Sequence, residues 1–237
     1  MSFYLPSDPD FEEALRIRRG EQKLDPALSP FIRSFAQHFD ATPLAVMTDT
    51  IPVAGTRRKQ PRLSVVLERS ADLRAFTLAD GFGFDSAKQA ATARIWADTM
   101  SGGHLSRFGL PPDQSEVDWV QDLFVYFAEF EKTAEWAAHE AVKGDELTRF
   151  IASLDLGDRF WRTERFVGPP IVFVYTDEQA ARLRSPEIRA RWADLYYPLV
   201  KRHDEFGYLD RNEIHVAVDS KETFERDYSG NWYYYFK

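Results

Sequence analysis

Residues near the C-terminus have the types and spacing that metal-dependent hydrolysis needs. The segment Asp219-Ser220-Lys221 follows an alternating stretch, and Asp210 lies upstream of it. Metal-dependent nucleases use acids at a strand end to hold Mg²⁺, and a nearby lysine positions or activates the attacking water. The sequence therefore allows a phosphodiesterase or nuclease-like hydrolase that uses Asp210, Asp219 and Lys221. The simpler interpretation is that Asp219 caps a helix and that Lys221 is solvated.

Other catalytic patterns are incomplete. No second histidine follows His139-Glu140 at the zinc-protease spacing, and the chain has no G-x-S-x-G elbow. The glycines of Asp80-Gly81-Phe82-Gly83 lack the third glycine and the Lys-Ser/Thr pair of phosphate-binding loops. The absence of cysteine excludes thiolate zinc sites and a cysteine nucleophile. We therefore expect a non-catalytic protein that has neither a cofactor nor a metal.

Negative charge is concentrated in one segment. The 237-residue chain has 30 Lys and Arg against 38 Asp and Glu, which gives a net charge of −8. Ten acids and only two bases lie between Asp113 and Glu146, so the rest of the chain is balanced. Such a segment attracts basic proteins and repels nucleic acid, although charge runs are commonly only solvated surface. We expect a basic partner protein to be contacted by Asp118, Asp122, Glu129, Glu131 and Glu135.

Aromatic residues form the other unusual run, Trp232-Tyr233-Tyr234-Tyr235-Phe236, and we predict a closing strand here. Successive side chains of a strand point to opposite faces, so five aromatics in a row occupy both. Either both faces are covered inside the domain, or one is a contact surface, where tyrosine is enriched. Trp232, Tyr233, Tyr234 and Tyr235 are therefore assigned to the binding surface. A structural subunit that assembles through them is a second alternative.

Bases and aromatics also alternate between Arg159 and Phe166, as they do in proteins that bind single-stranded nucleic acid. The acidic balance of the chain and the interrupting Glu164 argue against that function. Arginines that cover the edges of core aromatics are the commoner arrangement. We therefore do not expect nucleic-acid binding.

The elements that would position these residues are a mixture of helices and strands. Capping residues mark helix starts at Ser29-Pro30, at Ser185-Pro186 and near Asp85, and Pro198 is expected to kink or break its helix. Apolar and alternating residues predict strands at 43–53, 62–68, 171–175 and 213–218, whereas 119–130 fits strand or helix. The sequence predicts an α+β fold, with helices packed on a mixed sheet of about five to seven strands.

A single domain over residues 1–237 is predicted, because no change in composition marks a linker. Ser29-Pro30-Phe31-Ile32-Arg33 is echoed by Ser185-Pro186-Glu187-Ile188-Arg189, which allows an internal α/β duplication, although Ser-Pro is a common helix start. Neither a membrane-spanning run nor a secretory signal is visible. We expect a soluble, cytoplasmic binding or inhibitory protein of the immunity or antitoxin type.

Overall fold

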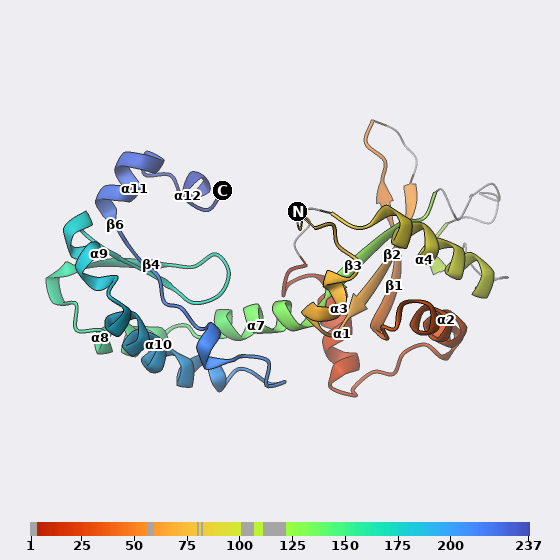
Figure 1. Cartoon of the computed structure of the whole chain (residues 1–237), viewed down its shortest axis with the longest axis horizontal. Coiled ribbons are helices and arrows are strands. Elements are labelled where there is room, and N and C mark those ends of the chain that lie inside the picture. The colour runs from red at the N-terminus through yellow and green to blue at the C-terminus, as the bar shows by residue number, and fades with distance from the viewer. Residues whose placement is uncertain (1–3, 56–58, 80, 82, 101–106, 111–121) are drawn as a thin grey trace. The chain divides into compact units, whose positions relative to one another are not determined.

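The chain forms two compact units in a computed structural model, which describes residues 4–55, 59–79, 81, 83–100, 107–110 and 122–237. The units comprise Met1–Thr133 and Ala134–Lys237, and each has its own sheet (Figure 1). Each unit also has its own apolar core. The α+β class is confirmed, but the six strands within the described ranges form two three-stranded mixed sheets, and not the single sheet expected from the sequence. No linker composition marks the division, because the helix α7 (Phe130–Ala141) crosses it.

The N-terminal unit is built around strand β2, which pairs antiparallel with β1 and parallel with β3. Its elements are α1 (Pro9–Arg18), a 3₁₀ turn (Pro26–Leu28), α2 (Ser29–Phe39), β1 (Pro43–Pro52), β2 (Lys59–Leu67), α3 (Ser70–Arg74), α4 (Ser86–Thr99), β3 (Phe124–Glu129) and the first turn of α7. The ambiguous segment of the sequence therefore contains a strand, and the next helix begins directly where that strand ends.

Side chains of β2 are buried on both faces of this sheet. Leu63 and Val65 share one core with Trp96 of α4. Ser64 and Val66, which alternate with them, point to the opposite face and are also buried. Helix α1 packs against β1, and its Phe11 stacks on Phe130 with the ring centroids 5.3 Å apart.

The C-terminal unit has the same arrangement around β5, which pairs antiparallel with β4 and parallel with β6. Its elements are the rest of α7, α8 (Asp145–Ser153), a 3₁₀ turn (Gly157–Arg159), β4 (Phe160–Glu164), β5 (Ile171–Val174), α9 (Asp177–Leu183), α10 (Pro186–Lys201), a 3₁₀ turn (Arg211–Glu213), β6 (Val218–Ser220), α11 (Lys221–Tyr228) and α12 (Trp232–Tyr235). Val172 and Val174 belong to a core with Tyr196 of α10. Phe173 points to the other face, where its ring contacts aromatic rings of α11 and α12.

The predicted strand at Trp232–Phe236 is wrong, because this run forms the short helix α12. Ser229 and Gly230 both have positive φ angles and reverse the chain. The side chain of Asn231 then accepts the backbone N–H of Tyr233 at 2.9 Å and caps the helix.

The predicted strand at 213–218 is also largely wrong. Ile214 and Val216 are buried as their alternation indicates, but the backbone pairs with β5 only from Val218 onward. The cap of the following helix is Ser220 and not Asp219. Pro198 does not end its helix, because α10 continues to Lys201.

The two hairpins share one irregularity. In the N-terminal unit Pro43 pairs with Leu67, and one residue of β1 is skipped before the next pair. In the C-terminal unit Phe160 pairs with Val174, and again one residue is skipped before the next pair. A bulge increases the local right-handed twist of a strand pair, so both sheets have this distortion at the same register position.

The parallel strands also match in register. Leu67 at the end of β2 pairs with Glu129, and Val174 at the end of β5 pairs with Ser220. Two residues then lead into α3 and α9, whereas no residue separates β3 from α7 or β6 from α11. Positions near these strand ends can therefore be matched residue by residue.

Helices α4 and α10 have the same place in the order of elements. In the sequence, each lies between the middle strand and the parallel edge strand of its own unit. Asp85 caps α4, as the sequence predicts, and Ser185 caps α10. The same positions after each cap are buried, namely Thr92, Ala93 and Trp96 in α4 and Trp192, Ala193 and Tyr196 in α10. The sequence echo at Ser29-Pro30 and Ser185-Pro186 instead pairs α2 with α10, which are not counterparts.

Candidate functional site

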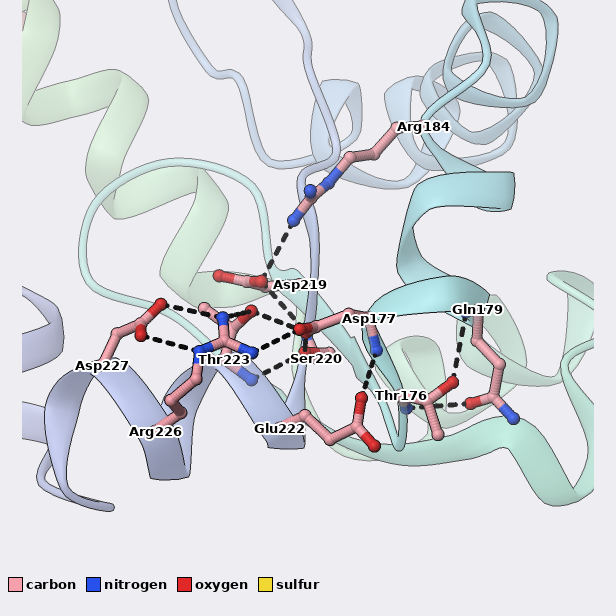
Figure 2. Close-up of polar contacts among 10 residues, drawn as sticks. All are labelled: Thr176, Asp177, Gln179, Arg184, Asp219, Ser220, Glu222, Thr223, Arg226 and Asp227. Atoms are coloured by element: carbon pink, nitrogen blue, oxygen red, sulfur yellow. Dashed lines mark hydrogen bonds and ion pairs between the residues drawn. The ribbon is translucent and has the colours of Figure 1, made fainter.

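Polar side chains gather where the parallel strands β5 and β6 end and where α9 and α11 begin (Figure 2). We call Asp177, Ser220, Glu222, Thr223 and Arg226 the C-terminal junction. Adjacent parallel strands end at the same edge of a sheet. The fold therefore brings Asp177 to Ser220 across 43 positions of sequence.

The carboxylate of Asp177 joins α9 to α11. Its Oδ1 accepts hydrogen bonds from the hydroxyls of Ser220 and Thr223, the latter at 2.7 Å, and its Oδ2 accepts one from Nη1 of Arg226. These hydrogen bonds, of which the one from Ser220 has the largest effect, hold the pKa of Asp177 far below its usual range. Asp177 therefore remains ionised at physiological pH.

Glu222 joins the same two helices in the opposite direction. Its carboxylate accepts the backbone N–H of Asp177 at 2.8 Å, and its own N–H donates to the carbonyl of Tyr175 at 3.3 Å. Thr176 and Gln179 form a reciprocal capping box at the start of α9. N–H groups that lack a partner inside α9 are thereby satisfied.

The hydroxyl of Ser220 is engaged both as a donor and as an acceptor. It donates to Oδ1 of Asp177, and this hydrogen bond lowers the pKa of that carboxylate. Ser220 is also fully buried, and its hydroxyl oxygen accepts the N–H of Thr223 at 2.9 Å. The arrangement stabilises the contact between the two helices.

Asp219 lies on the face of β6 that carries aromatic neighbours. Its carboxylate accepts hydrogen bonds from Arg184 at 3.0 Å, from the Tyr235 hydroxyl at 2.8 Å and from the N–H of Ser220 at 2.9 Å. Burial first, and then the hydrogen bond to Asp219, raise the pKa of Tyr235 above its usual range. Asp219 therefore fixes α12 to the sheet.

The residues of the predicted hydrolase have separate partners. The ammonium of Lys221 lies 3.5 Å from Glu225 and over the ring of Trp161. Asp210 caps a 3₁₀ turn by accepting a backbone N–H at 2.8 Å. None of these contacts joins either residue to Asp219. Within the described residues, no group of three or more histidine and acidic side chains could hold a metal ion.

Aromatic rings cover the sheet face that carries Asp219. The ring of Phe173 lies 5.3 Å from those of Trp232 and Tyr235, measured between centroids. Trp232 stacks on Phe224 of α11 at 3.9 Å. Residues three apart lie on one face of a helix, so the helical conformation lets Trp232 and Tyr235 both pack inward.

The outer side of α12 presents Tyr233 and Tyr234, which are 67% and 56% exposed. Phe166 and Val167, in the turn between β4 and β5, are also exposed, and Phe166 stacks on Phe236 with centroids 5.5 Å apart. We call these five residues the aromatic surface. Of the aromatic residues predicted to bind a partner, Tyr233 and Tyr234 are exposed, whereas Trp232 and Tyr235 are packed on the sheet.

The predicted acidic residues lie on several elements. Asp118 is outside the described residues. Asp122 precedes β3, Glu129 ends it and Glu135 lies on α7, and all three are half-buried. The acidic segment passes from one unit into the other along α7, and the described contacts do not define a single acidic face.

Glu131 is engaged within the N-terminal unit. Its carboxylate accepts the N–H of Ser70 at 2.8 Å and a hydrogen bond from Arg69 at 3.0 Å, and its own N–H donates to the carbonyl of Glu68 at 3.0 Å. Partial burial acts to raise the pKa of Glu131, but these hydrogen bonds lower it overall. Glu131 therefore makes the same two backbone hydrogen bonds as Glu222.

Glu146, at the end of the acidic segment, is also paired. Its carboxylate lies 2.8 Å from Nη2 of Arg202 and 2.8 Å from Nε2 of His203. The hydrogen bond with His203 is the main cause that lowers the pKa of Glu146. This acid is therefore partly neutralised inside the chain.

No protein-family model, curated protein or solved structure matches the chain. The helices that the structure describes include none that is long and apolar enough to cross a membrane. Sequence reasoning missed Asp177, Glu222 and Arg226. The pattern Thr176-Asp177-Glu178-Gln179 does signal a capping box, but no local pattern connects it to α11, because the contact depends on the pairing of β5 with β6.

Proposed function

We propose that the protein is a non-catalytic binding protein that recognises a basic partner protein through the aromatic surface of its C-terminal unit. The observation that carries this proposal is the contrast within α12. Trp232 and Tyr235 pack on the sheet, whereas Tyr233 and Tyr234 between them are exposed.

Exposed tyrosines are well suited to protein contacts. A tyrosine ring offers a large apolar area with few rotatable bonds, and its hydroxyl tolerates water. Binding energy at interfaces is concentrated in a few such residues. Phe166 and Val167 add exposed apolar area from a second element, the turn between β4 and β5.

Charge favours a partner that presents arginine and lysine. Each unit carries 19 acidic and 15 basic side chains, so both attract a basic protein at long range. Faces of aromatic rings also attract cations, and the ammonium of Lys237 lies 5.5 Å from the ring centroid of Tyr233. An inhibitor of a basic protein, of the immunity or antitoxin type, has these properties.

Fluorescence anisotropy with a labelled arginine-rich peptide tests this proposal. Wild-type protein is expected to bind the peptide, and binding should weaken as salt rises. Tyr233→Ala combined with Tyr234→Ala should weaken binding about tenfold, because each of the two exposed cation–π contacts contributes about 0.5–1 kcal/mol.

Tyr175→Ala is the matched control, since Tyr175 is exposed but follows the opposite end of β5 from the turn that contains Phe166. Equal binding by the double variant and wild type would overturn the proposal. So would light scattering that shows a wild-type dimer and a monomeric double variant, because the aromatic surface would then bind a second copy of the chain.

A further inference from the structure

The N-terminal unit has a cavity at the place where the C-terminal unit has its junction. The cavity has a volume of about 250 Å³. Its lining residues come from the end of β3, the start of α7, and α3 with the turn that follows it. They are Ser70, Leu73, Arg74, Thr77, Glu129 and Lys132, and we call this cavity the N-terminal hollow.

The glutamate contacts establish which residues correspond. Glu131 accepts the N–H of Ser70 at 2.8 Å, and Glu222 accepts the N–H of Asp177 at 2.8 Å. Each glutamate is the second residue after the strand-end pair of its sheet. Ser70 is therefore the counterpart of Asp177.

Counting from the strand-end pairs also identifies the counterparts of the residues on the other side of the N-terminal hollow. Glu129 and Ser220 occupy the matching strand-end positions. Three residues further along the chain, Lys132 is the counterpart of Thr223. In the C-terminal unit both counterparts donate a hydroxyl to the carboxylate of Asp177.

The N-terminal unit lacks the carboxylate that completes this arrangement. Ser70 has a hydroxyl where Asp177 has its carboxylate. The Ser70 hydroxyl oxygen is buried beside the carboxylate of Glu131, whose pKa it helps to lower, but it forms no hydrogen bond of good geometry within the described residues. The N-terminal hollow therefore borders a polar group that could form a better hydrogen bond to the carboxylate of a ligand.

Charge on the lining fits the same group. Arg74 is exposed and forms no ion pair among the residues that the structure describes. Lys132 adds a second positive charge, and Glu129 adds one negative charge. The lining is net positive, and arginine is the side chain best matched to a carboxylate.

We propose that the N-terminal hollow binds a carboxylate group, held by Arg74 and Ser70, that a ligand supplies in place of the missing side chain. The group belongs either to an acidic side chain of a peptide or to a small free carboxylate. This site is on a different unit from the aromatic surface and takes the opposite charge, so the two proposals can fail independently.

Titration of the full-length ¹⁵N-labelled protein by NMR tests the proposal. The probes are succinate, a blocked Ala-Glu-Ala peptide and uncharged succinamide. Succinate or the peptide should shift the Ser70 amide and the Arg74 amide and Nε signals, and the tighter binder identifies the source of the carboxylate. Succinamide should leave these signals unchanged.

Variants make the test specific. Arg74→Gln should weaken binding about tenfold, as expected for the loss of one charge-assisted hydrogen bond, whereas Arg33→Gln on α2 removes the same charge elsewhere in the unit and should have no effect. Ser70→Asp should abolish binding by supplying the carboxylate from the chain. The proposal is overturned if neither carboxylate shifts these signals, if succinamide shifts them equally, or if Arg33→Gln weakens binding as much as Arg74→Gln.

Discussion

In the N-terminal unit, the helix that packs on the sheet, α1, precedes the strands in the sequence. In the C-terminal unit, the helices that cover one face, α11 and α12, follow the strands. The middle strand, the bulge, the register and the capping glutamate are nevertheless the same in both. This comparison teaches that one core and the strand-end hydrogen bonds determine the backbone of such a unit. The second face of the sheet can be covered by a helix that precedes the strands in the sequence or by helices that follow them.

The two sheets also differ in the residues on their second face. The second face of the N-terminal sheet carries Val66 and Ala128, and the matching positions of the C-terminal sheet are Phe173 and Asp219. An aspartate there needs partners, which Arg184 and Tyr235 provide. The aromatic helix α12 is thus tied to the aspartate that the C-terminal sheet carries at this position.

The largest expected effect comes from removing one large buried side chain from one core at a time. Trp96→Ala and Trp192→Ala each remove a fully buried ring, and each should lower the free energy of unfolding of its own unit by about 3–5 kcal/mol. Hydrogen exchange measured by mass spectrometry should show lost protection in the altered unit only. Equal loss in both units from either substitution would mean that the two cores unfold together.

A smaller effect is expected from the capping glutamates. Glu131→Ala and Glu222→Ala should each cost about 0.5–2 kcal/mol, the range for loss of a helix cap, and should speed exchange of the Ser70 and Asp177 amides respectively. The Glu131 variant should cost more, because Glu131 also pairs with Arg69. Glu225→Ala, on the exposed side of α11, is the control and should leave both amides unchanged.

The hydrogen bond that fixes α12 should contribute less. Tyr235→Phe removes the hydroxyl that donates to Asp219 and should lower the free energy of unfolding of the C-terminal unit by about 0.5–1.5 kcal/mol. Tyr228→Phe is the matched control, since its hydroxyl forms no hydrogen bond within the described residues. Denaturation curves that do not distinguish the two variants would show that the anchor to Asp219 adds no stability.

The smallest expected effect is on the stability of the C-terminal unit at low pH. The folded pKa of Asp177 lies below its usual value, so this group stabilises the folded unit above about pH 4 and loses that effect as pH falls through the folded pKa. The side chains of Asp177 and Arg226 are 42% and 57% exposed, which limits the size of the effect. The melting temperatures of wild type and Asp177→Asn should differ most at pH 6, and the difference should shrink as pH falls from about 4 towards 2. A difference that stays constant between pH 6 and pH 2 would assign the effect to something other than the ionised carboxylate.

Local chemistry made part of this fold predictable. Helix starts at Asp85 and Ser185-Pro186 follow from capping, and the strand at 171–174 follows from its β-branched residues. The helix predicted at Ser29-Pro30 does begin there, but Ser29 is its first residue and makes no capping hydrogen bond. Trp232–Phe236 was predicted wrongly because aromatic residues favour strands, whereas here the cap at Asn231 and the inward packing of Trp232 decide for helix.

Contacts between distant segments were not predictable. The C-terminal junction joins residues 177 and 220–226, and only the parallel pairing of two strands brings them together. The division into two units was hidden for a related reason, because a regular helix crosses the boundary without any change in composition. The shared topology was hidden too, since matching positions such as Trp96 and Tyr196 keep their burial and not their identity.

The direct passage from β6 into α11 restricts how this chain can change in length. One residue inserted between Ser220 and Lys221 would rotate α11 by about 100°. That rotation would carry Glu222 away from Asp177 and Phe224 away from the sheet. Insertions and deletions among descendants of this sequence should therefore be rare where this helix begins.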